Sequence, residues 1–574
     1  MAPELESADA TGHPVRESWK WLVVGWLGLF VACFVMAPIP AVNETHYLGK
    51  ARHFFNPAWC AGDPFLESPS VHVVFFASIG WLAPFFGLTI TAIIARAAFL
   101  WVLAWGLWRL GEALGLPPAG RLTALWVPPL LVTVANVSGE WIVGGAESKT
   151  IAYGCLFAAM AAFIRSDAGW RTTNRRELAA CASLLAWSIA WHPIVGIWGT
   201  LVCLAGGLGS ALWWKGPRTS EVVASSPPST APAAPPTAPA WLVWIILAAG
   251  WPAACWAMLA AFQVSLAGGA SDDLRFQANF IQVYYRLAHH LDPMVIPRAA
   301  WMKGIFATLL ATAAGLMVWH RLHRFPAMGN ISPEATPRAT LMRGWGFLVM
   351  ATAATVLLSA AGYAIGYGPR PAAEMPGFHW RMLLLKFYPF RLADVFVPLL
   401  LAFSLARLLT VPSRSMAAVP SAFGREWLPP ALALLLLLAT GVSLYGSWEA
   451  TGLALKKRSD WLATCEWVFH NTPRETLCFA PTGHPSFKWY ADRPEYVSFK
   501  DCPQDPQGIV DWNNRLLVIS RWLQSYLDEG RYTADGLRDL HALTGLRLFI
   551  TDRIGPFDVA PVYENDSYRV YALP

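Results

Sequence analysis

The stretch Trp21–Tyr47, WLVVGWLGLFVACFVMAPIPAVNETHY, indicates a chain that enters a membrane close to its N-terminus. A membrane span needs about 20 mostly apolar residues, and Trp21–Pro40 meets this requirement. No cleavage pattern follows, so we expect a retained signal anchor with Arg16 and Lys20 on the cytoplasmic side. Polar residues begin at Asn43, which predicts a loop on the opposite, exoplasmic side.

The composition of the whole chain is typical of a membrane protein. Of its 574 residues, 55% are hydrophobic and 14% are charged, whereas about 25% are charged in soluble proteins. This excludes a disordered chain, a small disulfide scaffold and an ordinary cytosolic enzyme. Glu449–Pro574 holds 14 Lys and Arg and 17 Asp and Glu, which leaves 29 and 20 for residues 1–448. The chain therefore divides into a membrane body and a soluble C-terminal domain.

Further apolar runs predict a polytopic α-helical membrane protein with about 11–13 spans. These runs are Ile90–Leu110, Leu122–Ala135, Thr150–Ile164, Leu178–Trp191, Ile194–Trp214, Trp241–Gln263, Trp301–Val318, Trp345–Tyr363, Phe387–Leu409 and Leu428–Tyr445. Val71–Phe86 is also apolar. Two full membrane crossings over 71–110 would, however, place the later basic loops on the exoplasmic side. We therefore expect a re-entrant segment or a hidden short span there.

Basic residues between the spans set the direction of the chain. The body carries nine more positive than negative charges, which favours cytoplasmic loops over nucleic-acid binding. Two spans separate each basic loop from the next, so all four loops can lie on the cytoplasmic side. These loops are Arg165–Arg176, Lys215–Arg218, His320–Arg343 and Arg407–Arg425. We expect a bacterial inner-membrane protein with residues 1–20 cytoplasmic and residues 448–574 periplasmic or exoplasmic.

The expected transmembrane domain, residues 21–447, contains three long connections. Residues 41–70 and 265–300 are exoplasmic loops. Residues 216–240 form a disordered cytoplasmic linker, because their Pro, Ala and Ser residues cannot bury a core.

The C-terminal residues mix the two kinds of periodicity, which predicts a small α/β domain. Helices are expected over Trp461–His470, Asn514–Glu529 and Ala534–Thr544, and strands over Thr476–Ala480, Leu546–Thr551 and Tyr568–Ala572. A disulfide between Cys478 and Cys502 fits the exoplasmic side, although spacing alone does not fix the pairing.

Ionisable residues gather in the expected exoplasmic loops, where such groups are costly and tend to be functional. Carboxylates, histidines and basic residues there could face one cavity at the outer interface. Arginine and lysine would hold a phosphate, and a carboxylate would take a proton from an acceptor hydroxyl. This set suits an anionic lipid-linked substrate. The chain has no P-loop, which argues against an ATP-driven pump.

A first span, an acidic residue a few positions beyond it, many further spans and a C-terminal exoplasmic domain resemble the GT-C superfamily of membrane glycosyltransferases. The resemblance implies a polyprenyl-phosphate-linked sugar donor, an exoplasmic glycan, lipid or protein acceptor, and a catalytic or metal-binding carboxylate in the first loop. That carboxylate is Glu44; Asn43 stands where many members have Asp. A divalent cation such as Mg²⁺ or Mn²⁺ is one cofactor that this resemblance allows. The layout also resembles multi-span proteins of planctomycete-type bacteria, which imply no function.

Each candidate residue has a functional and a structural interpretation. Glu44 is a catalytic carboxylate or a helix cap. Asp272 and Asp273 are further catalytic candidates or solvated acids. Glu147 either binds substrate or interacts with the N-terminal dipole of the helix that follows it. Lys149 either binds substrate or extends its side chain to the membrane interface. The other substrate-binding candidates are His192, which otherwise belongs to a turn, His289, Arg381 and Arg391.

Two of these candidates have specific alternatives. His289, with His290 and Asp292, resembles a metal cluster but lacks repeated ligand spacing. Arg391 grips a lipid phosphate, with Arg381 or Lys386 assisting, or it pairs with Asp394 three residues on.

Two other functions compete with the transferase. One is a lipid or glycan transporter or flippase, which carboxylates within spans and symmetrically broken helices would favour. The other is a non-enzymatic envelope protein that uses its exoplasmic domain for binding. The acids lie mostly at one surface, which favours the transferase.

Overall fold

The computed structural model describes residues 14–166, 174–213, 240–266, 270–324, 338–411, 427–444 and 455–573, except 553 and 556. The expected linker over 216–240 lies outside these residues, apart from Ala240, and so do residues 1–13 of the expected N-terminal tail.

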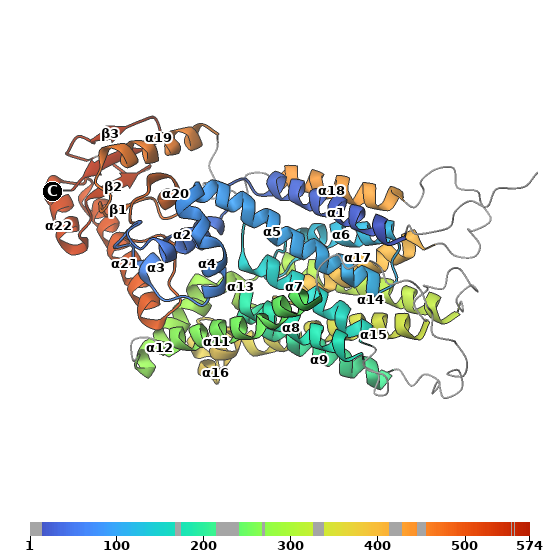
Figure 1. Cartoon of the computed structure of the whole chain (residues 1–574). Coiled ribbons are helices and arrows are strands. Elements are labelled where there is room, and N and C mark those ends of the chain that lie inside the picture. The colour runs from blue at the N-terminus through green and yellow to red at the C-terminus, as the bar shows by residue number, and fades with distance from the viewer. Residues whose placement is uncertain are drawn as a thin grey trace, which may run out of the picture.

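Long apolar helices form the body of the molecule (Figure 1). They are α1 Pro14–Met36, α5 Ala83–Ala113, α6 Pro118–Ala135, α7 Ser148–Arg165, α8 Arg175–Trp191, α9 Pro193–Trp213, α10 Ala240–Ala248, α11 Gly250–Leu266, α14 Arg298–Arg324, α15 Arg338–Gly366, α17 Ala393–Thr410 and α18 Leu428–Leu444. Seven described helical stretches are long and apolar enough to cross a membrane. Each apolar run that the sequence assigns to a span overlaps a helix, and the expected integral multi-pass membrane protein is confirmed.

The apolar run over 71–86 does not form a span of its own. It folds into α4, Val73–Ile79, and a 3₁₀ turn, Gly80–Leu82, that leads into α5. Seven helical residues extend about 10 Å, a third of the hydrocarbon thickness. Gly87 has a φ of +73°, which turns the chain before α5 continues. One crossing over this region keeps the alternation of loops that the sequence requires.

A close approach between α5 and α7 fixes the frame of the outer end. A Cβ atom on Gly106 would lie 2.1 Å from the carbonyl oxygen of Gly154, so both positions need glycine. Small residues allow such backbone contact between helices in membranes. Arg96 in α5 and Lys149 in α7 are therefore carried on two rigidly packed helices.

Short elements occupy the layer between the body and the C-terminal domain (Figure 1). They are α2 Glu44–Phe55, α3 Pro64–Glu67, α4, α12 Asp272–Phe280, the π-helix η3 Ile281–Arg286, α13 Ala288–Leu291, η4 Ala372–Glu374 and α16 Phe378–Leu385. Their side chains and those of the domain above form the polar sites described below.

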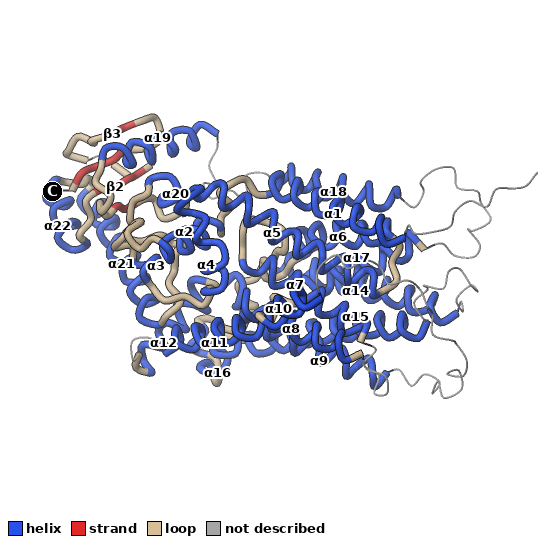
Figure 2. Tube along the Cα trace, viewed as in Figure 1, coloured by secondary structure: helices blue, strands red, loops and turns tan. Residues whose placement is uncertain are grey.

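The C-terminal domain holds a four-stranded sheet at one end of the molecule (Figure 2). Its elements are α19 Leu455–Asn471, β1 Cys478–Phe479, α20 Phe487–Ala491, α21 Pro506–Glu529, α22 Ala534–Thr544, β2 Leu548–Thr551, β3 Tyr563–Glu564 and β4 Arg569–Ala572. The strand order is β1-β2-β4-β3, with β1 parallel to β2 and the other pairs antiparallel.

Strand β2 is buried on both faces because helices cover both sides of the sheet. Phe549 packs in one core with Trp512 of α21, whereas Ile550 packs in the other with Trp461 of α19. This confirms the expected α/β character of the domain. The expected Cys478–Cys502 disulfide is wrong, since all nine cysteines are free thiols and the Cys478 thiol donates to the carbonyl of Thr476 at 3.3 Å.

Candidate functional site

Lys149, at the first turn of α7, lies between two buried carboxylates from the loop that precedes the helix. Its Nζ atom is 3.4 Å from Glu140 Oε1 and 3.5 Å from Glu147 Oε2. The same ammonium lies 3.5 Å from the centroid of the Trp141 ring, and the Trp141 indole donates to Glu147 Oε1 at 2.8 Å. Glu140 and Glu147 are 2% and 3% exposed, so both need cations close by.

Arg391, just before α17, completes this arrangement from the opposite side. Its Nε lies 2.8 Å from Glu140 Oε2 in an ion pair, and its Nη1 lies 3.4 Å from His192 Nε2. The guanidinium also stacks over the Tyr388 ring, 4.1 Å from the centroid. We call Glu140, Glu147, Lys149 and Arg391 the outer cluster. It alternates two cations with two anions in a site that is nearly closed to water.

Asp394 holds the loop of the outer cluster in place. Its carboxylate accepts hydrogen bonds from the backbone of Val137 at 2.7 Å and of Ser138 at 2.8 Å, and from the Ser138 hydroxyl at 2.8 Å. Arg391 is thus paired with Glu140, and Asp394 organises the loop instead of forming the i,i+3 pair that the spacing offered.

The C-terminal domain adds a further cation above the outer cluster. Burial and the neighbouring Arg286 guanidinium lower the pKa of Lys500 to about 8, against the opposing attraction of Glu147. Arg286 donates to the Lys500 carbonyl at 3.0 Å. Lys500 therefore brings a positive group of the C-terminal domain within electrostatic range of Glu147.

Glu44 forms a buried ion pair with Arg96 of α5. The two carboxylate oxygens accept from Arg96 Nε and Nη2, each at 2.6 Å. They also accept from the backbone amides of Ala41 at 2.8 Å and Ala146 at 2.7 Å. Glu44 and Arg96 are 0% and 1% exposed. Glu44 thus links the first loop to the loop that carries Glu147, and its oxygens are fully engaged.

A second buried cluster joins the first loop to the C-terminal domain. Lys488 of α20 lies 3.2 Å from Asp63, 3.0 Å from Glu495 and 2.6 Å from Asp501. His46 of α2 adds a contact of 3.0 Å to Asp501. We call these five residues the Lys488 cluster. Three carboxylates around one lysine leave an excess of negative charge unless one carboxylate binds a proton.

Glu495 is the carboxylate of the Lys488 cluster whose pKa is raised. Burial, with the like charges of Asp501 and Asp63, raises the pKa of Glu495 to about 8, although Lys488 opposes the shift. Burial would also raise the pKa of Asp501, but Lys488 and His46 outweigh it and hold that pKa below the ordinary value.

Stability should therefore fall as the pH rises through neutrality. A raised carboxyl pKa stabilises the folded state fully below the ordinary value of 4.5, and this contribution is lost as the pH rises to about 8. Between pH 6 and 8 we expect a loss of about 1–3 kcal/mol of unfolding free energy. Thermal unfolding of the detergent-solubilised protein, followed by tryptophan fluorescence, measures it. Glu495→Gln should flatten the profile and the exposed Glu475→Gln should not; identical profiles for both variants would contradict this assignment.

Two apolar cavities lie in the body, and Asp394, whose carboxylate is 3.5 Å from the backbone nitrogen of Glu140, lines the outer one. The outer cavity, about 710 Å³, includes Val137, Trp301 and Asp394 in its lining. The inner cavity, about 360 Å³, continues past Ser210 to Trp319. Thr308, Val356 and Val397 line both cavities.

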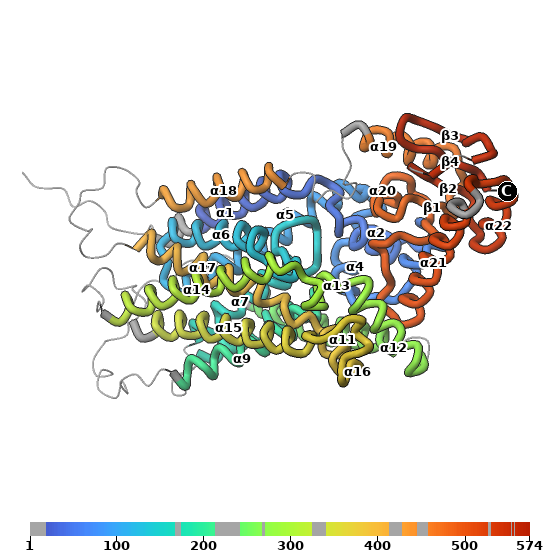
Figure 3. Tube along the Cα trace, turned by 180° about the vertical axis from the view of Figure 1, so that it is seen from behind, coloured from blue at the N-terminus to red at the C-terminus, as the bar shows by residue number. Residues whose placement is uncertain are grey.

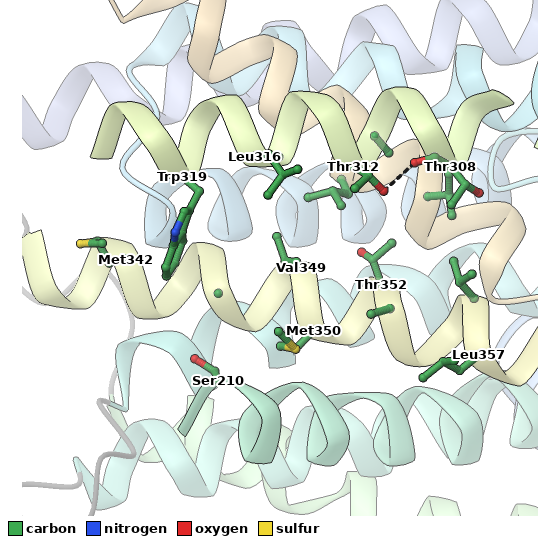
Figure 4. A pocket seen from close by; sticks show the side chains of 17 residues that line it. Ser210, Thr308, Thr312, Leu316, Trp319, Met342, Val349, Met350, Thr352 and Leu357 are labelled. Atoms are coloured by element: carbon green, nitrogen blue, oxygen red, sulfur yellow. Dashed lines mark hydrogen bonds between the residues drawn. The ribbon is translucent and has the colours of Figure 1, made fainter. Parts of the chain in front are cut away.

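We call the two cavities together the groove. It runs along α14 beside α15 and α17, which lie next to one another in Figure 3. Figure 4 shows Trp319 and Leu316 of α14 pointing toward α15 in the inner cavity. From Trp301 to Trp319 the groove extends about 27 Å, close to the thickness of the hydrocarbon core. Its outer end adjoins the outer cluster through Asp394.

Comparison with known proteins gives one short family match and several similar structures. A family model for a domain of unknown function, DUF6798, matches residues 459–519. No curated protein matches the chain.

Three of the similar solved structures come from an archaeon and a bacterium. The archaeal oligosaccharyltransferase AglB from Archaeoglobus fulgidus, in complex with an inhibitory peptide and a dolichol-phosphate, is 11% identical over 93% of this chain and 69% of that chain, with a TM-score of 0.41. The apo form of the oligosaccharyltransferase from the same organism is 10% identical over the same shares, with a TM-score of 0.43. ArnT from Cupriavidus metallidurans, bound to undecaprenyl phosphate, is 13% identical over 97% of this chain and 98% of that chain, with a TM-score of 0.37.

The structure brings three of the candidates from the sequence together. Glu147, Lys149 and Arg391 belong to the outer cluster, and His192 contacts it through Arg391. Glu44 is outside the outer cluster but accepts a hydrogen bond from the backbone of Ala146, the residue before Glu147.

Other candidates lie elsewhere. Asp272 and Asp273 occupy the exposed first turn of α12, where Asp272 is 3.7 Å from Arg275. Arg381 donates to the carbonyls of Ile365 and Tyr367 at 3.1 and 3.0 Å. His289 lies against His290, with ring centroids 3.9 Å apart and ring planes at 45°.

The described residues do not fit a metal ion. Among them, no group of three or more His, Cys, Asp and Glu side chains is arranged to hold one. Glu44, the ligand that the family resemblance implies, has both oxygens on Arg96. The chemistry proposed below is therefore assigned to side chains.

Proposed function

We propose that the protein is a membrane glycosyltransferase that moves a sugar from a polyprenyl-phosphate-linked donor to an exoplasmic acceptor. The observation that carries this proposal is the buried outer cluster, which Asp394 connects to the outer end of an apolar groove. An ionic site next to a groove of bilayer length matches a substrate with a charged head and a long hydrocarbon tail.

Lys149 and Arg391 bind the donor phosphate in this proposal. The phosphate takes the place of the carboxylates that neutralise these cations here, and Arg391 offers the planar fork that phosphate oxygens fit. Lys500 adds charge from the C-terminal domain. Because the site is nearly closed to water, these interactions are stronger than they would be at a surface.

Glu140 is the proposed general base. It is buried, and its Oε1 accepts no hydrogen bond within the described part of the chain. That oxygen takes the proton of the acceptor hydroxyl as the hydroxyl oxygen forms a bond to the anomeric carbon. The bond from that carbon to the phosphate oxygen breaks, and polyprenyl phosphate leaves with its negative charge held by Lys149 and Arg391.

Two further carboxylates have supporting roles in the proposal. Glu147 orients Lys149, and Glu44, with Arg96, positions the loop through Ala146. Neither Asp272 nor Asp273 has a role, because both lie on an exposed helix turn.

The proposed side of the membrane follows from the basic helix ends. Arg165 ends α7 about 24 Å from Lys149, and Arg407 lies in the last turn of α17. By the positive-inside rule these ends are cytoplasmic, so the outer cluster is exoplasmic.

Sugar transfer from labelled polyprenyl-phosphate donors by the purified full chain tests the proposal. We expect Glu140→Gln to lower the transfer rate by about 10²–10⁴-fold, the usual contribution of a general base. The matched control is Glu374→Gln, which changes an exposed carboxylate of η4. Transfer at the wild-type rate by Glu140→Gln would remove Glu140 as the base, and no transfer from any such donor by the wild type would overturn the function.

A further inference from the structure

A third cavity, away from the outer cluster and the groove, lies where the first loop meets the C-terminal domain. It encloses about 190 Å³ between the end of α2, the turn around Trp59 and the end of α19. Its charged lining residues are Arg52, Arg474, Arg493 and Asp492. This volume accommodates a phosphate group or one acidic sugar.

The charge of this cavity is positive because its single lining carboxylate is already engaged. Asp492 accepts from Arg52 Nη1 at 3.1 Å and from the Trp59 indole at 2.9 Å. Arg493 is buried and donates to carbonyl oxygens, including those of Phe469 at 2.7 Å and Asp492 at 3.1 Å. Among the described residues it has no ion-pair partner.

Two guanidinium groups retain donors for a ligand. Arg52 Nε is buried and has no hydrogen-bond partner among the described residues. Arg474 is exposed at the rim and makes no hydrogen bond or ion pair within the part of the chain that the structure describes. Guanidinium donors of this kind form paired hydrogen bonds with carboxylate and phosphate oxygens.

The position of the cavity relates it to the reaction proposed above. Helix α2 begins at Glu44, one hydrogen bond from the loop of the outer cluster, and reaches Arg52 two turns later. This separation is about 12 Å along the helix. The cavity thus lies about two helical turns from the residue that contacts the outer-cluster loop, a span that a saccharide of a few units covers.

We propose that this cavity is an acceptor subsite for a carboxylate or phosphate group on a saccharide. The inference rests on the proposed transferase function and specifies an anionic acceptor. Arg474 and Arg52 Nε donate hydrogen bonds to the anion, and the buried positive charge of Arg493 attracts it electrostatically. The Trp59 ring is covered by Arg52, 4.5 Å from its centroid, and is not a stacking surface for the sugar.

Calorimetric titration of the full chain in nanodiscs of zwitterionic lipid tests the subsite without requiring transfer. The probes are glucuronate, glucose 6-phosphate and uncharged glucose. We expect the two anions to bind and glucose not to bind. Arg474→Gln should weaken binding of the anions about tenfold, as expected for the loss of one charge-assisted contact. Arg521→Gln, which removes an exposed arginine of α21, is the matched control.

Three outcomes would overturn the subsite. One is equal binding of the anions by the wild type and Arg474→Gln. Another is loss of their binding in Arg391→Gln, which would move the anion to the outer cluster. The third is weaker binding of the anions when the wild type, but not Arg474→Gln, is placed in nanodiscs that contain phosphatidylglycerol. That result would assign the cavity to a lipid headgroup. If the wild type still transfers sugar, each of these outcomes refutes the subsite but not the transferase function. Anion binding that depends on Arg474, in a protein that transfers no sugar, would refute the transferase function but not the anion site.

Discussion

Replacing Arg391 with glutamine is expected to lower sugar transfer by about 10²–10³-fold. The variant loses the guanidinium that, in the proposed reaction, neutralises the departing polyprenyl phosphate, and removal of one such preorganised group costs a factor of this size. It also leaves Glu140 with Lys149 alone, 3.4 Å away. Rates and donor KM measured with purified protein would quantify the effect.

Arg391→Lys distinguishes charge from geometry at this position. Lysine keeps the charge but lacks the planar fork that phosphate oxygens fit, so an intermediate rate is expected. Arg547→Gln, which changes an exposed arginine of the C-terminal domain, should transfer at the wild-type rate. A wild-type rate for Arg391→Gln itself would show that this arginine does not contact the reacting phosphate.

Replacing Glu44 with alanine is expected to lower the free energy of unfolding by about 3–5 kcal/mol. The change leaves Arg96 as an unpaired charge inside the body, and breaking a buried pair from one side usually costs this much. Two backbone amides, at Ala41 and Ala146, also lose their acceptor. Thermal unfolding in detergent would measure the loss.

A double variant separates the charge effect from the packing. Glu44→Leu with Arg96→Met removes both charges and should recover most of the stability, since apolar pairs often replace buried ion pairs at little cost. Glu44→Gln keeps the shape of the side chain. Normal folding of Glu44→Gln with complete loss of transfer, while Glu140→Gln remains active, would return the role of base to Glu44.

The spans could be predicted from the sequence because each apolar run carries its own signal. The runs at Trp21–Pro40 and Ile90–Leu110, for example, both coincide with long helices. Helix Ala534–Thr544 was also predicted with the bounds that the structure has, from its amphipathic period alone. Strand β3 and helix α20 were not predicted, because two and five residues are too short for a periodic pattern.

The candidate site could be predicted only in part, because its pairings are long-range. Glu147, Lys149 and Arg391 were chosen for their place at the outer side, but Glu140 was given no role. Arg96 was missed, although a lone arginine within an apolar run is a recognised signal of function or of a buried partner. The Lys488 cluster joins Asp63 to residues more than 400 positions later, and no spacing rule links them.

The segment that matches the domain model of unknown function, residues 459–519, does not contain its own folding partners. Its one strand, β1, pairs with β2 at Leu548–Thr551, and its buried Lys488 depends on Asp63 of the first loop. Expressed alone, this segment would lack the rest of its sheet and one of the acids that neutralise Lys488. The unit that must be kept intact in a shorter protein is therefore discontinuous: the whole C-terminal region together with residues 44–67.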